Sequence, residues 1–81
     1  MDLGDLRSRD GFGDLNQDEV AFCANNHVTP RLLLRARKDL IDKSQSSVVT
    51  IYDVRLISSL DLLRSQALYE FLIEQRHLPV P

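Results

Sequence analysis

The sequence contains a single cysteine, no tryptophan, and only two tyrosines and three phenylalanines as aromatic residues among its 81 positions. One cysteine cannot form an internal disulfide, so a disulfide scaffold is excluded and a reducing compartment is indicated. No apolar run approaches the roughly 20 residues of a membrane span, and the acidic start is unlike a signal peptide. The scarcity of aromatic residues predicts a small core made mainly of aliphatic side chains.

The chain also lacks an excess of positive charge, because ten Lys and Arg face twelve Asp and Glu. A nucleic-acid-binding module usually shows a marked basic excess. The charge is unevenly distributed, however: residues 1–19 carry six acids and two bases, and residues 28–43 carry five bases and two acids. Half of the positive charge therefore lies in one short segment, and any anionic partner should be sought there first.

The length allows one domain at most. All three glycines lie within residues 1–14, where neither a helical nor a strand period is visible. We therefore expect a flexible leader at residues 1–14, an ordered domain at residues 15–78 and a tail at residues 79–81. Phe12 and Leu15 are expected to fold back onto the domain.

Two helix starts are visible in the first half of the ordered part. Asn16 followed by Glu19 is a capping-box arrangement, which predicts a short helix that ends near residues 25–27. Thr29 followed by Pro30 combines an N-cap with proline at the first helical position, where its missing N–H costs nothing. The second helix should run to about Asp42, and the polar residues 44–47 follow it as a break.

The second half begins with an ambiguity at residues 48–54, which are β-branched enough for a strand. Thr50 followed by Asp53 resembles another cap, so we favour a short extended entry and then a helix to about Ser58. Asp61 is the expected N-cap of the last helix, at about residues 62–75. The resulting prediction is an all-α domain of four helices.

The second helix is amphipathic at about 100° per residue. Its apolar half contains Leu32, Leu33, Ala36, Leu40 and Ile41. The opposite side contains Arg31, Arg35, Lys38 and Asp42. A solvated face is the commoner explanation of such a stripe, and an anionic contact surface is the alternative.

The last two helices, joined by a tight turn at residues 58–60, have a helix-turn-helix outline. In the last one, an inner side is expected for Leu62, Leu68, Tyr69, Phe71, Leu72 and Ile73. The outer side is expected to show Leu63, Gln66, Ala67, Glu70 and Glu74. Groove reading needs donors to bases and phosphates, and only Gln66 clearly offers them, with Arg64 near the edge. Glu70 and Glu74 would repel phosphate, so this helix is not expected to read DNA.

Residues 60–74 (LDLLRSQALYEFLIE) resemble the final helix of SWIRM domains, and the closest pattern is that of the transcriptional adaptor 2 group, approximately IDVNKTRKIYDFLIREG. Upstream, residues 15–23 (LNQDEVAFC) resemble the L-S-x-x-E-x-x-L-C opening of that group. Thr29-Pro30 followed by Leu33 or Leu34 resembles its next helix. The resemblance covers about residues 15–78.

This resemblance implies a compact SWIRM-like helical domain with a helix-turn-helix-like C-terminal half. Such domains belong to nuclear chromatin complexes that acetylate, demethylate, deubiquitinate or remodel, where they contact nucleosomal DNA, histone tails or other subunits. None of these roles makes the domain an enzyme. The chain departs from the adaptor pattern at Gln66, Ala67, Glu74 and Arg76, where basic residues or glycine are usual, and at Leu63, where asparagine is usual.

We therefore expect a non-catalytic, chromatin-associated module of a transcription-regulatory or histone-modifying complex. It would bind partner subunits, nucleosomal DNA or histone tails, and no membrane, small-molecule substrate or cofactor. The expected contact residues are Arg31, Arg35, Arg37, Lys38, Leu63, Arg64, Gln66 and Ala67. The alternative is a pure protein-interaction or scaffold domain that binds no DNA, with Leu63 and Ala67 in the contact. Cys23 and His27 are too few for a metal site, so no metal or catalytic residue is expected.

Overall fold

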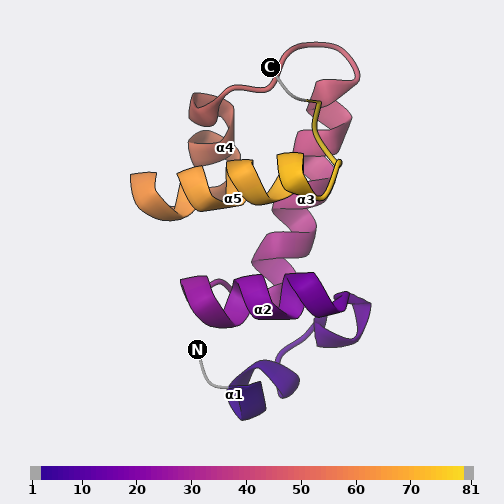
Figure 1. The fold of residues 1–81 in the computed structure, drawn as a ribbon, viewed down its shortest axis with the longest axis vertical. Helices are drawn as coiled ribbons and strands as arrows, with labels where there is room; N and C mark the ends of the chain where they lie inside the picture. The colour runs from indigo at the N-terminus through magenta and orange to yellow at the C-terminus, as the bar shows by residue number, and fades with distance from the viewer. Residues whose placement is uncertain (1–2, 80–81) are drawn as a thin grey trace. The chain divides into compact units, whose positions relative to one another are not determined.

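The computed structural model describes residues 3–79, so residues 1–2 of the expected leader and 80–81 of the expected tail lie outside the described part. Within the described part the chain is all-α, as predicted, with no strand (Figure 1). Its elements are α1 (Leu3–Arg7), the 3-10 helix η1 (Phe12–Asp14), α2 (Gln17–Asn26), α3 (Pro30–Ser44), α4 (Ile51–Ser58) and α5 (Leu62–Glu74). None of the helices in residues 3–79 is both long enough and apolar enough to cross a membrane.

The helices belong to two compact units, and the chain passes from the first to the second inside α3, between Arg35 and Ala36. The first unit holds α1, η1, α2 and the start of α3. The second holds the rest of α3, α4 and α5. This boundary falls inside the segment that the sequence presents as one domain.

Helix α1 is the element that the sequence did not predict. Leu6 is fully buried, and the Ser8 hydroxyl donates to the Asp5 carbonyl at 2.7 Å. The expectation of no regular structure before residue 15 is therefore wrong at residues 3–7 and 12–14. The physical reason is that a helix of little more than one turn, anchored by one leucine, is too short to show a period.

Gly11 joins these two short helices and has a φ of +89°, a left-handed conformation that side chains rarely adopt. A Cβ atom at this position would lie 3.0 Å from Cδ1 of Leu34. The backbone turn therefore favours glycine here, and a Cβ atom would in addition require a small shift of the Leu34 side chain.

Helix α2 begins as the sequence predicts. The backbone N–H of Glu19 donates to Oδ1 of Asn16 at 2.8 Å, and the backbone N–H of Asn16 donates to Oε1 of Glu19 at 3.0 Å. Glu19 is almost completely buried. The helix ends at His27, which adopts a left-handed conformation with φ of 53°. Thr29 then caps α3, because its hydroxyl accepts from the backbone N–H of Leu32 at 3.3 Å.

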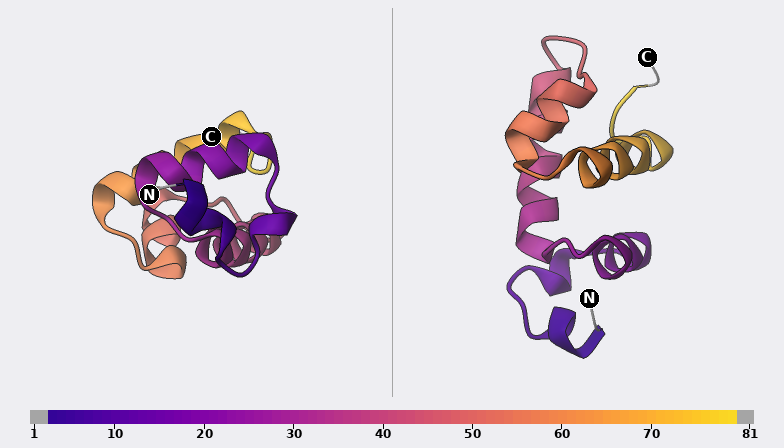
Figure 2. Two further views of the ribbon diagram at one scale, coloured as in Figure 1. Left: turned by 90° about the horizontal axis from the view of Figure 1, so that it is seen from below. Right: turned by 90° about the vertical axis from the view of Figure 1, so that its left-hand side faces the viewer.

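The second unit confirms a helix at residues 51–58 rather than a strand. Thr50 and Asp53 form a complete capping box at the start of α4. Ser59 adopts a left-handed conformation with φ of 61°, and the chain then turns directly into α5 (Figure 2). Asp61 caps α5 by accepting from the backbone N–H of Arg64 at 3.4 Å. Helices α4 and α5 pack against each other, which gives the second unit a helix-turn-helix outline.

The core side of α5 is narrower than the sequence suggested. Leu68, Leu72 and the unpredicted Ser65 are fully buried. The Ser65 hydroxyl donates to the Leu60 carbonyl at 3.1 Å, so its polar group is satisfied. Leu62 was expected inside but is 52% exposed, because Ser65 and not the first leucine of the helix faces the preceding turn.

Candidate functional site

The outward side of α4 exposes large apolar side chains. Tyr52 is 75% exposed and Leu56 is 82% exposed. They are four residues apart and therefore lie on the same side of this short helix. The other side of the helix buries Val54 and Ser58. A single exposed leucine is ordinary, whereas an exposed tyrosine and leucine on one helix face form a patch.

This patch borders a shallow hollow of about 390 Å³, which we name the α4 pocket. It is lined by Tyr52, Arg55, Leu56, Ser59 and Leu60. Leu60 is buried, so it forms the apolar base, while Tyr52 and Leu56 stand at the open side. The pocket exists because the left-handed turn at Ser59 brings Leu60 back beside the end of α4.

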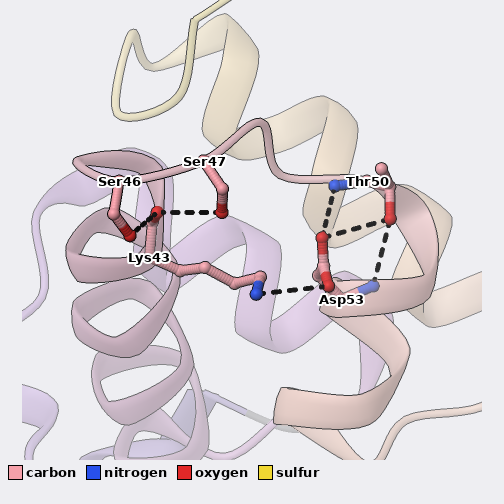
Figure 3. A network of polar contacts seen from close by, with 5 residues as sticks. All are labelled: Lys43, Ser46, Ser47, Thr50 and Asp53. Carbon is pink, nitrogen blue, oxygen red and sulfur yellow. Dashed lines mark hydrogen bonds and ion pairs between the residues drawn. The ribbon is translucent and has the colours of Figure 1, made fainter.

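The carboxylate of Asp53 is fully engaged at the start of α4. It accepts from the backbone N–H of Thr50 at 2.8 Å and from the Thr50 hydroxyl at 3.1 Å, and Nζ of Lys43 lies 3.7 Å away (Figure 3). The Thr50 backbone N–H, with further help from the Thr50 hydroxyl and Lys43, holds the pKa of Asp53 below its usual value. The hydroxyls of Ser46 and Ser47 donate to the Lys43 carbonyl and hold the connecting turn on the end of α3, while the Lys43–Asp53 ion pair links α3 to the start of α4.

The carboxylate of Asp61, on the other flank of the pocket, is engaged as well. The Arg64 guanidinium beside Asp61 lowers the pKa of that carboxyl, and the two groups form an ion pair. By contrast, the guanidinium of exposed Arg55 has no carboxylate partner among residues 3–79. The pocket therefore has one unpaired cation and no unpaired anion beside it.

The contact residues predicted on α5 divide into two groups. Leu63 is 78% exposed and Gln66 is also exposed, so both are accessible. Ala67 and Arg64 are half-buried, and the Arg64 guanidinium is held on Asp61. Tyr52, Arg55 and Leu56 were not among the predicted contact residues. The signal that could have revealed them is the i,i+4 spacing of Tyr52 and Leu56 opposite Val54.

The basic residues predicted on α3 are divided between the two units. In the first unit Arg31 and Arg35 are exposed, and neither has a carboxylate partner in the described part of the chain. In the second unit Lys38 is exposed and Arg37 is half-buried. Arg31 also lines a polar hollow of about 430 Å³ together with Asp5, Ser8, Arg9, Asp10 and Thr29. Of its three charged neighbours there, Asp5 and Arg9 pair with each other at 3.4 Å.

Cys23 is fully buried in the first unit. Burial, and then the nearby Glu19 carboxylate, raise the pKa of its thiol to about 11. Since the thiolate is the reactive form, Cys23 is unsuited to nucleophilic attack at neutral pH. His27, four residues on, is exposed at the helix end. Residues 3–79 contain no group of three or more His, Cys, Asp or Glu side chains that could hold a metal ion.

Comparisons with known protein families, curated proteins and solved structures found no match to this chain. The candidate site is therefore assigned from its own geometry and chemistry.

Proposed function

We propose that this chain is a non-catalytic interaction module of a nuclear transcription-regulatory or histone-modifying complex, in which it docks onto a partner subunit. The observation that carries this proposal is the exposure of Tyr52 and Leu56 on α4, together with Leu63 on the first turn of α5. The docking surface consists of these three side chains and the α4 pocket.

Fully burying a leucine side chain contributes roughly 1.5–3 kcal/mol, so Leu56 and Leu63 each offer a partner a substantial gain. Tyr52 and Arg55 are of the types that most often dominate binding energy in protein interfaces.

The chromatin setting rests on the resemblance of residues 15–78 to SWIRM domains. The all-α fold and the helix-turn-helix outline of the second unit support it. The exposed Leu63 and Gln66 on α5, where the adaptor group has other polar or basic residues, favour a protein contact by that helix over a DNA contact.

The test uses the full chain as bait in nuclear extract, followed by identification of the captured proteins. We expect subunits of a histone-modifying or transcription-regulatory complex, and we expect Leu56→Asp and Leu63→Asp each to abolish their capture. Val48→Asp is the matched control, because Val48 is also an exposed apolar residue (72%) but is not part of the docking surface, since it precedes α4 in the chain. The proposal is wrong if both the Leu56 and the Leu63 variants capture the same subunits as the wild type, or if no such subunit is captured.

A second candidate function is DNA contact by the first unit, favoured by the exposed and unpaired Arg31 and Arg35. Phosphate contact predicts that log K for duplex DNA falls linearly with log salt. Changing Arg31 and Arg35 to Glu should abolish this binding. Undetectable binding of the wild type at low salt would eliminate this candidate and leave the docking proposal intact.

A further inference from the structure

We propose that the α4 pocket binds a segment of a partner protein that places an apolar side chain in the hollow and an Asp or Glu carboxylate on Arg55. This inference rests on the proposed function, since it specifies the chemistry of the partner that the docking surface accepts.

The shape of the pocket fits an apolar side chain. Its volume of about 390 Å³ lies at the lower end of the range of small-molecule pockets, roughly 300–1,000 Å³. Tyr52 and Leu56 border it on the helix, and Leu60 closes its base. A leucine, isoleucine or phenylalanine from a partner would remove Tyr52 and Leu56 from water and contact the already buried Leu60.

The polar groups around the pocket determine the charge of the partner. The Arg55 guanidinium only donates hydrogen bonds, whereas the Tyr52 phenol and the Ser59 hydroxyl can both donate and accept them. The carboxylates of Asp53 and Asp61 are already engaged by Thr50 with Lys43, and by Arg64. The pocket thus has one unpaired positive charge and two hydroxyls that are able to donate, and a carboxylate is the side chain that complements them.

A second copy of the chain is a poorer occupant. In a two-fold contact the same patch faces itself, so the Arg55 of each copy would approach the pocket of the other. Neither pocket has an unpaired carboxylate to receive it among residues 3–79. Burying an unpaired guanidinium is unfavourable, so self-association through this patch would be opposed.

Nucleic acid is also a poorer occupant, because phosphate binding draws on several cations and this patch has only Arg55 free. The leucines beside it would face a highly charged backbone and gain nothing from it. An acidic and apolar peptide uses the cation and the apolar groups at once.

The experiment is a selection of a random-peptide display library on the immobilised full chain. We expect the selected peptides to combine Leu, Ile or Phe with Asp or Glu within one helical turn. Arg55→Glu should reverse the preference to Lys or Arg, and Leu56→Asp should select no peptide. Arg31→Glu is the matched control for charge reversal outside the pocket and should leave the selection unchanged.

The selected peptide is then synthesised with Asp replaced by Asn, or Glu by Gln. Because hydrogen bonds to charged groups are the strong ones, this change should weaken binding to the wild type about tenfold or more and to Arg55→Gln only slightly. The far-ultraviolet spectrum and thermal midpoint of each variant, measured alongside, should match the wild type because the substituted side chains are exposed.

Three results would overturn the inference: no enriched peptide, enrichment without an acidic preference, or a preference that survives Arg55→Glu. Concentration-dependent self-association that is abolished by Leu56→Asp would also overturn it, because a second copy would then cover the patch. The proposed function is separable from this inference. If Leu56→Asp abolishes capture of the complex but Arg55→Glu does not, docking through α4 stands and the acidic preference fails.

Discussion

The exposed side of α3 in the first unit is basic, whereas the exposed side of α4 in the second is mainly apolar and carries one basic residue, Arg55. Arg31 and Arg35 extend into solvent from α3, whereas Tyr52 and Leu56 do so from α4. Each helix packs an apolar side chain into the core of its own unit, Leu33 from α3 and Val54 from α4. The difference therefore lies entirely in the side that folding leaves free.

This difference separates what folding requires from what binding requires. An outward arginine is solvated at little cost and keeps a helix surface soluble, so its presence on α3 needs no partner. Two large apolar side chains on an eight-residue helix have an unfavourable free energy of hydration until another surface covers them. The surface of α4 is thus the better indicator of function.

The largest expected effect separates the buried from the exposed leucines of the second unit. Leu68→Ala should lower the free energy of unfolding by about 2–5 kcal/mol, because it removes a fully buried side chain and leaves a cavity. Leu56→Ala should change it by less than about 0.5 kcal/mol, because Leu56 is mostly in solvent. Urea titration of the two variants measures both values. A loss at Leu56 as large as that at Leu68 would show that α4 uses its outer side for folding.

The next largest change in the free energy of unfolding is expected at the two capping boxes. Asn16→Ala and Thr50→Ala should each lower the free energy of unfolding by about 1 kcal/mol, since each removes a cap from the first turn of a helix. The change at Asn16 should be the larger, because the backbone N–H that loses its acceptor belongs to the buried Glu19. The corresponding N–H next to Thr50 belongs to Asp53, which keeps access to solvent. Thermal unfolding of both variants gives the order, and a larger loss for Thr50→Ala would contradict it.

The smallest effect concerns pH and lies in the second unit. The pKa values of Asp53 and Asp61 are lowered in the folded chain, so the unfolded state takes up protons first as the pH falls. Both carboxylates therefore stabilise the folded chain at pH values above the ordinary pKa of aspartate. This stabilisation is lost as the pH falls through their lowered pKa values. We expect Asp53→Asn with Asp61→Asn to flatten the acid side of the stability profile. Because both groups are solvent-accessible the effect should be modest, and a profile unchanged from the wild type would contradict its cause.

The helices of the two units differ in how well their starts and their core sides could be predicted from the sequence. The starts of α2, α3 and α5 were predictable because Asn16, Thr29 and Asp61 cap by local hydrogen bonds that depend on residues three positions away. Helix α1 was not predictable, because it is fixed by the burial of Leu6 against the rest of its unit. The core side of α5 was misjudged because Ser65 is buried through its bond to the Leu60 carbonyl, which no hydrophobic pattern reveals.

The candidate site was only partly predictable for the same reason. Leu63 could be placed on the outside of its helix from periodicity alone. The α4 pocket could not be foreseen, since it requires both that residues 51–58 be helical and that Ser59 turn the chain left-handed so that Leu60 closes the hollow. The Thr50–Asp53 cap predicted the helix, but nothing in the sequence indicated the left-handed conformation of Ser59.

The most direct test of docking through α4 measures capture of the proposed partner complex by three forms of the full chain: the wild type, Leu56→Asp, and the double variant Arg31→Glu/Arg35→Glu. Docking through α4 predicts that Leu56→Asp loses the complex while the double variant retains it at the wild-type level. The reverse result, with capture lost in the double variant and kept by Leu56→Asp, would contradict the account and move the functional surface to α3.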